Sequence, residues 1–300
     1  MSKFEGASAI VTGGASGIGR ALAEQLCMAG ASVTIVDIDG PSADEVAAVL
    51  SKEGHRIRAA ILDVADYDRL SHVVTRVAQD HGQLDLMFNN AGIGVVGEVQ
   101  DMTIDHWRRA LDVNLMGVVN GVAAAYPIMV AQGHGHIINT SSMGGVIPMP
   151  ATVNYATAKF GIMGLSQSLR FEAELLGVCV SVVCPSRVDT PFAENTEWIN
   201  LDREWIMENT IPGGMISATE CARRILKGVA KNKAVINVGE AGFGAWVHRH
   251  FPFVTRALAR RVGRQVSANR AAVLARQLRR RFSDSSSTSN ANHLQNTRRD

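Results

Sequence analysis

The chain has 300 residues, of which 46% are hydrophobic, and this composition excludes a long disordered protein because it can bury a large core. Its net charge of +2 hides an asymmetry: residues 1–240 carry 18 Lys and Arg against 26 Asp and Glu, a net of −8, whereas residues 241–300 carry 12 Arg against 2 Asp, a net of +10. The N-terminus has no apolar run long enough for a signal peptide, and the four cysteines form no C-x-x-C pair, so we expect a cytoplasmic protein with reduced thiols and no metal site.

Short runs rich in β-branched residues alternate with helical patterns from residue 7 to residue 239. The predicted strands are 7–13, 31–37, 57–64, 84–90, 135–142, 178–185 and 234–239. The predicted helices are 17–29, 42–53, 66–81, 103–131, 152–176 and 217–231, the last opening with a capping box from Ser217 to Glu220. Because the strands are apolar on both faces and are separated by helices, they predict an α/β fold, a doubly wound (Rossmann-type) parallel sheet of about seven strands.

A glycine-rich turn joins the first predicted strand to the first predicted helix. Its sequence, VTGGASGIGR, spaces Gly13, Gly17 and Gly19 as G-x-x-x-G-x-G, with Ser16 and Ile18 on either side of Gly17. Glycine leaves out the Cβ where backbone approaches a pyrophosphate, and the N-terminus of the following helix attracts negative charge. The turn therefore predicts a dinucleotide site.

Two carboxylates end the second and third predicted strands. Asp37 lies eighteen residues after Gly19, where a carboxylate accepts hydrogen bonds from both adenosine ribose hydroxyls. It would repel a 2′-phosphate, and no Lys or Arg occupies 13–19 or 36–40, so the sequence favours NAD over NADP. Asp63 and the adjacent Val64 fit a contact to the adenine edge.

Polar motifs follow the fourth and fifth predicted strands. N-N-A-G spans residues 89–92, T-S-S spans 140–142, and Asn114 lies within the predicted helix 103–131, where asparagine competes for backbone hydrogen bonds. Tyr155 and Lys159 share one helix face at i and i+4. Together with T-G-x-x-x-G-x-G and a serine thirteen residues before the tyrosine, these motifs make residues 5–240 resemble the short-chain dehydrogenase/reductase family.

The resemblance implies a role for each matching residue at the reaction centre. Tyr155 would be the general acid/base that exchanges a proton with the substrate oxygen, and Ser142 would hold that oxygen. Lys159 would bind the nicotinamide ribose and lower the pKa of Tyr155, as a nearby cation does. Asn114 would anchor a water molecule that links Lys159 to the solvent.

The resemblance also implies the rest of the cofactor site. Thr190 would bond the carboxamide and Val188 would offer a backbone contact, while the N-N-A-G motif would supply Asn90, Ala91 and Gly92. One departure is Ser186, where the family usually has glycine, so we expect a slightly different loop beside the nicotinamide. Family members commonly assemble through the equivalents of helices 103–131 and 152–176, so a homodimer or homotetramer is expected.

The loops after the fourth, fifth and sixth strands carry an apolar set rich in Met and Trp. Its members are Ile93, Val95, Met143, Val146, Met149, Phe192, Trp198, Trp205 and Met215. Of these we assign Met143, Met149 and Phe192, with Ser142, to the substrate. The set suits a bulky hydrophobic alcohol or ketone such as a steroid, retinoid or lipid, although half of it can equally be ordinary core.

The basic C-terminal part divides into a helical extension, 241–282, and a disordered tail, 283–300. From Pro252 onward, apolar residues recur at i+4, and arginines fall on the opposite face; the apolar residues are Val254, Leu258, Val262, Val266, Leu274, Leu278 and Phe282, and the arginines are Arg256, Arg260 and Arg264. Three interpretations stay open: peripheral membrane contact through 252–282, an arm against another subunit, or a solvated helix whose Arg stems lie along the protein. Nucleic acid is not expected, because no reading module accompanies the charge.

The sequence thus predicts an NAD(H)-dependent oxidoreductase acting on a secondary alcohol or its ketone. Two alternatives are a non-catalytic NAD-binding redox sensor or scaffold that acts through its basic tail, and an NADP-dependent carbonyl reductase. A matched Ser–Tyr–Lys set argues against the first, and Asp37 argues against the second.

Overall fold

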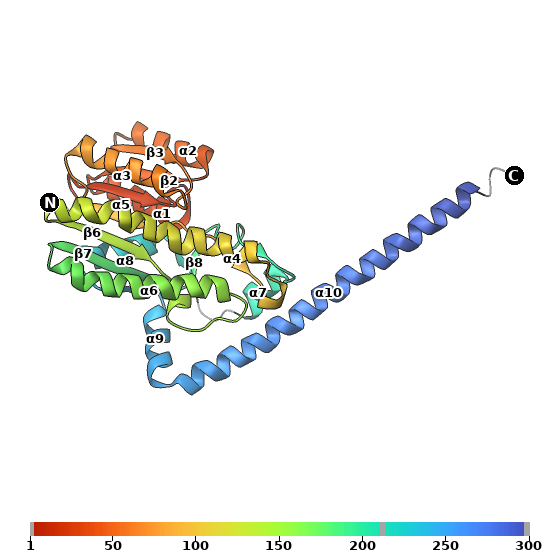
Figure 1. Ribbon diagram of the computed structural model, residues 1–300. Coiled ribbons are helices and arrows are strands. Elements are labelled where there is room, and N and C mark those ends of the chain that lie inside the picture. Colours follow the sequence, from red (N-terminus) through yellow and green to blue (C-terminus); the bar gives the residue numbers. More distant parts are fainter. Residues whose placement is uncertain (1–2, 211–213, 297–300) are drawn as a thin grey trace.

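A computed structural model describes residues 3–210 and 214–296, with side chains described to residue 279. Its centre is a seven-stranded sheet in the order β11-β7-β6-β4-β1-β2-β3, and every pairing in it is parallel (Figure 1). The strands are β1 (Ser8–Thr12), β2 (Ser32–Asp37), β3 (Ile57–Ile61), β4 (Leu86–Asn89), β6 (Gly135–Thr140), β7 (Val178–Pro185) and β11 (Val235–Val238). The predicted doubly wound sheet is confirmed, and the chain reverses direction across the sheet between β1 and β4.

Helices cover both faces of the sheet. One face carries α1 (Gly17–Met28), α2 (Gly40–Lys52) and α8 (Ala218–Val229), and the other carries α3 (Tyr67–His81), α5 (Gly117–Gln132) and α6 (Val153–Glu174). The two-residue period of a strand explains the division, since Val11 packs into the first layer and its neighbour Ile10 into the second. Ser217 caps α8 as predicted, accepting from Glu220 N at 3.2 Å.

The predicted helix 103–131 is divided into three parts. α4 (Ile104–Leu111) and α5 are joined by η2 (Asp112–Met116), a single π-helical turn that contains Asn114. By length and apolarity the stretch Ile104–Gln132 could cross a membrane, and it is the one such stretch among the described residues. Here α5 packs against α3, β4 and β6, so it forms part of the domain core.

Several short elements that the sequence did not indicate lie at the carboxyl edge of the sheet. They are β5 (Val95–Val96), η1 (Val99–Asp101), η3 (Met143–Gly145), β8 (Val188–Asp189), β9 (Glu197–Trp198), α7 (Arg203–Asn209) and β10 (Ile216–Ser217). β5 pairs with β9 and β8 with β10, which ties the loops of this edge to one another. The four cysteines are unpaired, as expected for reduced thiols.

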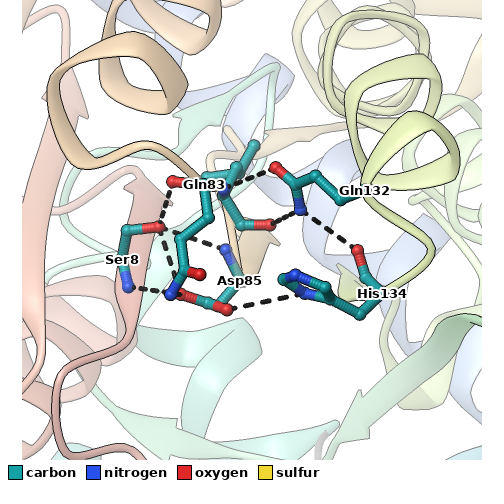
Figure 2. Close-up of polar contacts among 6 residues, drawn as sticks. Ser8, Gln83, Asp85, Gln132 and His134 are labelled. Atoms are coloured by element: carbon teal, nitrogen blue, oxygen red, sulfur yellow. Dashed lines mark hydrogen bonds and ion pairs between the residues drawn. The ribbon is translucent and has the colours of Figure 1, made fainter.

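The opposite, amino edge of the sheet is closed by a polar network (Figure 2). Asp85 Oδ2 accepts from Ser8 N at 2.8 Å and from Gln83 Nε2 at 2.9 Å, while its Oδ1 lies 3.7 Å from His134 Nδ1. Gln132 exchanges two hydrogen bonds with the backbone of Leu84 at the end of α5. These contacts satisfy the strand ends there, which leaves the carboxyl edge for ligands.

The C-terminal extension consists of α9 (Ala241–His250) and α10 (Pro252–Asn296), and α10 leads away from the domain (Figure 1). Its start at Pro252 agrees with the predicted helix. The backbone stays helical past residue 282, where a disordered tail was expected, because a helix already under way extends without a new nucleation cost. Residues 297–300 of that predicted tail lie outside the described part of the chain.

Candidate active site

The glycine-rich turn between β1 and α1 crowds a Cβ at Gly13, Gly17 and Gly19. A Cβ on Gly19 would lie 1.9 Å from Gly13 O, one on Gly13 would lie 2.9 Å from Ala91 Cα, and one on Gly17 would lie 3.0 Å from Thr190 Cγ2. Gly13 and Gly17 also have φ of +66° and +51°, which glycine adopts without strain. The bare backbone forms a cradle at the N-terminus of α1 that fits a pyrophosphate.

The residues beside Gly17 complete this turn. Ser16 is the N-cap residue of α1, and its side chain makes no cap hydrogen bond, so its hydroxyl is open to a ligand. Ile18 instead packs against the core layer under α1. The sequence had grouped both residues as cofactor contacts, and the geometry gives Ser16 the more direct position.

Asp37 ends β2 next to the phosphate turn. Its Oδ2 accepts from Ala15 N at 2.9 Å and its Oδ1 from Asp39 N at 3.1 Å, so backbone amides fix the carboxylate at the sheet edge. On the neighbouring strand connection, Asp63 Oδ1 accepts from Ala65 N at 2.9 Å, and Val64 is buried. These three predicted residues therefore line one side of the same edge.

The N-N-A-G motif is held by Thr12, the last residue of β1. Thr12 Oγ1 accepts from Asn90 N at 2.9 Å and from Ala91 N at 3.0 Å, and Asn90 Nδ2 donates to Thr12 O at 3.1 Å. The motif after β4 is thereby fixed against the phosphate turn after β1. Thr12 was missed as a site residue, although its place at a strand end within V-T-G-G is a usable signal.

Asn114 is fully buried in the π-helical turn, where it bonds another segment of the chain. Its Oδ1 accepts from Ile93 N at 3.1 Å, and its Nδ2 donates to Ile93 O at 3.0 Å and to Ala110 O at 2.9 Å. A Cβ on Gly92 would lie 2.8 Å from Asn114 Oδ1 and 3.6 Å from Lys159 Nζ. Both polar groups thus approach one point, and π turns of this kind often occur at functional sites.

Lys159 is only 3% exposed, and Nζ donates to Thr140 O at 2.9 Å. Its ammonium lies 5.4 Å from the centroid of the Tyr155 ring. Burial lowers the pKa of Lys159 to about 8, because removal from water disfavours the charged form. The lysine and tyrosine predicted to share one helix face do so, at the end of β6.

Tyr155 is half-buried at the start of α6, and a hydrogen bond joins it to Ser142. Burial raises the pKa of Tyr155, and the Ser142 hydrogen bond works in the opposite direction. The sequence had predicted a lowered pKa through Lys159. In the protein chain by itself desolvation is the larger effect.

The loop after β7 shows how Ser186 replaces the expected glycine. Ser186 does not have a positive φ, and its Oγ accepts from Glu240 N at 3.3 Å. Gly239, with φ of +69°, makes room for it, since a Cβ there would lie 2.0 Å from Ser186 Oγ. The loop leads on through Val188 in β8 to Thr190, whose Oγ1 accepts from Phe192 N at 3.5 Å.

The predicted substrate residues separate into two groups. Phe192 lies against Tyr155 with ring centroids 5.9 Å apart, and Met149 Sδ lies 3.2 Å from the position of a Gly144 Cβ, which in turn is 3.6 Å from Tyr155 Cε1. Met143 turns its sulfur toward Gly244 in α9. In contrast, Val95 is fully buried, and Trp198 and Trp205 pack under α10 rather than beside Tyr155. Gly144 was missed because no sequence pattern marks it.

Known proteins resemble this chain in sequence. The chain matches the family model of the short chain dehydrogenases over residues 7–199. It is 33% identical over 243 residues to the putative oxidoreductase SadH of Mycobacterium tuberculosis, which covers 80% of this chain and 88% of SadH. It is 35% identical over 196 residues to the oxidoreductase UcpA of Escherichia coli, which covers 65% of this chain and 74% of UcpA.

Solved structures agree with the fold. A short chain dehydrogenase/reductase from Burkholderia phymatum, in complex with NAD, superposes with a TM-score of 0.77 at 26% identity, covering 85% of this chain and 97% of its own. A short-chain dehydrogenase from Sphingobium yanoikuyae, in complex with NADPH, has the same fold with a TM-score of 0.70 at 24% identity, covering 83% and 95%. Proteins of this fold therefore take either cofactor.

Proposed function

This chain belongs to the short-chain dehydrogenase/reductase family and is an oxidoreductase, and from that premise we propose that it transfers a hydride between NAD(H) and a hydrophobic secondary alcohol or its ketone. The observation that carries the proposal is the meeting of Ser142, Tyr155 and Lys159 at the carboxyl end of β6. These groups stand beside a glycine cradle that fits a dinucleotide. When bound, the nicotinamide supplies or accepts the hydride.

The side chains of the site divide the remaining work. Ser142 holds the substrate oxygen, and Tyr155 takes the hydroxyl proton during oxidation or returns it during reduction. Lys159 supplies a positive charge near the phenol, and with a pKa of about 8 it is still mainly protonated at neutral pH. That charge and the Ser142 hydrogen bond both favour the phenolate, against the effect of burial.

Asn114 and Lys159 provide the exit for the proton. Asn114 Oδ1 and Lys159 Nζ face the same point beside Gly92, where the backbone has no side chain. A water molecule held there would connect the buried ammonium to the solvent. The buried position of Asn114 and its three hydrogen bonds support a fixed rather than a mobile role.

The choice of NAD over NADP rests on Asp37. Two backbone amides hold its carboxylate at the end of β2, and no Lys or Arg in 13–19 or 36–40 could pair with a 2′-phosphate. The hydrophobic substrate is supported by Phe192 and Met149, which lie close to Tyr155. These two side chains favour an apolar ring or chain next to the reacting carbon.

We extend the proposal to assembly as a homodimer or homotetramer. α6 carries Phe160 and Phe171 with 44% and 74% of their surface exposed, its C-cap Leu175 is 87% exposed, and α4 carries Ile104 with 62% exposed. Apolar side chains in such number on neighbouring helices favour a partner surface. A second copy packed on α4 and α6 would bury them.

The first test measures NADH formation at 340 nm from NAD+ with a panel of steroid, retinoid and aliphatic secondary alcohols. Wild type is compared with Tyr155→Phe, and with Tyr126→Phe as a matched control, since Tyr126 packs in the α3–α5 layer away from the site. Tyr155→Phe should lose roughly 10²–10⁴ in turnover, as expected for loss of a general acid/base, while its NAD+ affinity stays within about twofold.

Three results would count against the proposal. Equal turnover in Tyr155→Phe and wild type would remove the tyrosine from the chemistry. Tight NAD+ binding by wild type without turnover of any panel member would favour the redox sensor, and faster turnover with NADP+ than with NAD+ would favour the carbonyl reductase.

A further inference from the structure

The middle of α10 packs on loops at the carboxyl edge of the sheet. Val266 is buried and Val262 half-buried, in one cluster with Ala151, Leu201 and Ile206. The outer parts of the apolar stripe do not join this cluster, since Leu258 and Leu278 are 47% and 54% exposed. Among the residues whose side chains are described, the central turns of the helix are therefore the part docked on these loops.

An ion pair fixes this docked part to η1. Arg270 donates from Nε and Nη2 to the two carboxylate oxygens of Asp101, each at 2.5 Å, and its Nε lies 3.5 Å from Glu98 Oε2. Ser267 also donates to Glu98. The Asp101 side chain is only 9% exposed, so this forked contact is shielded from water. Hydrogen bonds from Arg270 hold the pKa of Asp101 below its ordinary value.

A second polar contact fixes α10 to α7. Asn269 is 6% exposed, and its Oδ1 accepts from Asp202 N at 3.0 Å. Asp202 is the N-cap of α7, where its Oδ1 accepts from Trp205 N at 3.2 Å, and its Oδ2 lies 3.3 Å from Arg276 Nη2. The start of α7 is therefore held from the C-terminal side of the chain.

The segment before Tyr155 also contacts α10. Ala151, which α10 covers, precedes Tyr155 by four residues and has φ of +62°, a strained conformation for alanine. Its carbonyl accepts from Gly97 N at 2.8 Å. Met149, two residues earlier, approaches Gly144 beside Ser142 and Tyr155. Packing from α10 keeps this strained turn in place.

We propose that the central turns of α10 form, within the same chain, a fixed back wall of the substrate pocket. In this wall Arg270 is a positioning residue for substrate binding: it holds the loop 96–101 directly and the loop 196–206 through Asp101, whose carboxylate also hydrogen-bonds to the Asn200 side chain. The inference rests on the proposed function for its link to catalysis. The match to the family model ends at residue 199, so it does not include α10. The cofactor cradle makes no use of it, so the two halves of the site depend on different parts of the chain.

The test compares Arg270→Gln with Arg261→Gln, a matched control on the same helix. Arg261 is exposed and makes no ion pair within the described residues. Hydrogen exchange should speed up in 96–101 and 196–206 in Arg270→Gln only, by about tenfold or more, and the NAD+ affinity should stay within about twofold. With a substrate found in the panel, KM should rise about tenfold with kcat little changed, which corresponds to a weakened binding wall.

Unchanged exchange in both loops would overturn the proposal, whatever the activity. Because exchange and NAD+ binding need no turnover, this result is separable from a failure of the proposed oxidoreductase reaction. A reversed pair, Asp101→Arg with Arg270→Asp, should restore slow exchange if the contact itself is responsible, and lack of restoration in a folded protein would count against it.

A disulfide tests whether the wall comes from the same chain. Glu98→Cys and Ser267→Cys, combined in a Cys179→Ser background, place two thiols where a hydrogen bond now joins the side chains. Oxidation should give a monomer band on a non-reducing gel. A disulfide-linked dimer would show that α10 is exchanged between copies and would overturn the single-chain wall.

Discussion

Lys159 Nζ lies 5.4 Å from the centroid of the Tyr155 ring and donates to Thr140 O at 2.9 Å. Burial acts on both groups, and in each it favours the neutral form: it lowers the pKa of Lys159 and raises that of Tyr155. Acid–base chemistry at this site instead requires a protonated lysine beside a tyrosine that can lose its proton. The charged states that this chemistry needs are therefore the ones that burial disfavours. Because burial shifts these pKa values, the stability of the fold depends on pH.

Lys159 should make stability increase with pH above neutrality. Its pKa is about 8 in the folded chain against 10.5 for a free lysine, so between these values the unfolded state binds more protons and unfolding becomes less favourable as pH rises. Relative to Lys159→Met, wild type should gain about 2–3 kcal/mol in free energy of unfolding from pH 7 to pH 10. Urea denaturation at the two pH values measures it. Lys227→Met, at an exposed lysine, is the control and should show no such change.

Asp37 should decide the cofactor. In Asp37→Asn the charge that repels a 2′-phosphate is removed, while one oxygen is kept for the backbone amides of Ala15 and Asp39. We expect NADP+ to bind roughly 10–100-fold more tightly and NAD+ several-fold more weakly, since the repulsion is partly screened at this half-exposed position. Fluorescence titration with each cofactor checks this. An unchanged ratio of the two dissociation constants would separate Asp37 from cofactor choice.

Asn114 should contribute to both stability and turnover. Asn114→Ala removes the hydrogen bonds to the half-buried Ile93 N and O and to Ala110 O, which should cost about 2–4 kcal/mol in free energy of unfolding. Turnover should fall at least about tenfold, because the point beside Gly92 loses its acceptor. Ser166→Ala is a suitable control, since it also removes two buried hydrogen bonds, in α6, away from the reacting groups. Equal losses of turnover in both variants would reduce Asn114 to a structural residue.

Ser186 and Gly239 should be coupled. Gly239→Ala places a Cβ against Ser186 Oγ at a φ of +69°, so it should destabilise the fold by about 2–3 kcal/mol. In the double variant with Ser186→Gly the clash is gone and only the backbone penalty, about 1–2 kcal/mol, should remain. A double-mutant cycle by urea denaturation gives the coupling, and strict additivity would contradict it.

Local patterns predicted which residues gather at the carboxyl edge of the sheet around the glycine-rich turn. The glycine spacing from Gly13 to Gly19 and the i to i+4 step from Tyr155 to Lys159 each lie within a short stretch of the chain. Such local patterns can be recognised in the sequence alone. The carboxyl ends of parallel strands then bring Asp37 and the N-N-A-G motif to the same edge.

Contacts between residues far apart in the sequence could not be predicted from local patterns. Arg270 and Asp101 are 169 residues apart, and no periodicity links them. The apolar stripe on α10 was visible in the sequence, but its partner was not, and three interpretations remained. The direction of the Tyr155 pKa also depends on burial, which only the packed structure gives. Likewise, Gly239 relieves the Ser186 substitution from fifty-three residues away.

The last part of α10 projects away from the domain and offers an attachment point. From its contact with Asp202 at Arg276, the backbone continues as a helix for twenty residues to Asn296, a rise of about 30 Å. Figure 1 shows this end standing well clear of the sheet and its helices. A dye, an affinity handle or a whole reporter domain joined to the carboxyl end would be carried on a ready-made spacer. Such a fusion leaves the glycine-rich turn, the Ser142–Tyr155–Lys159 group and the loops that contact α10 unobstructed.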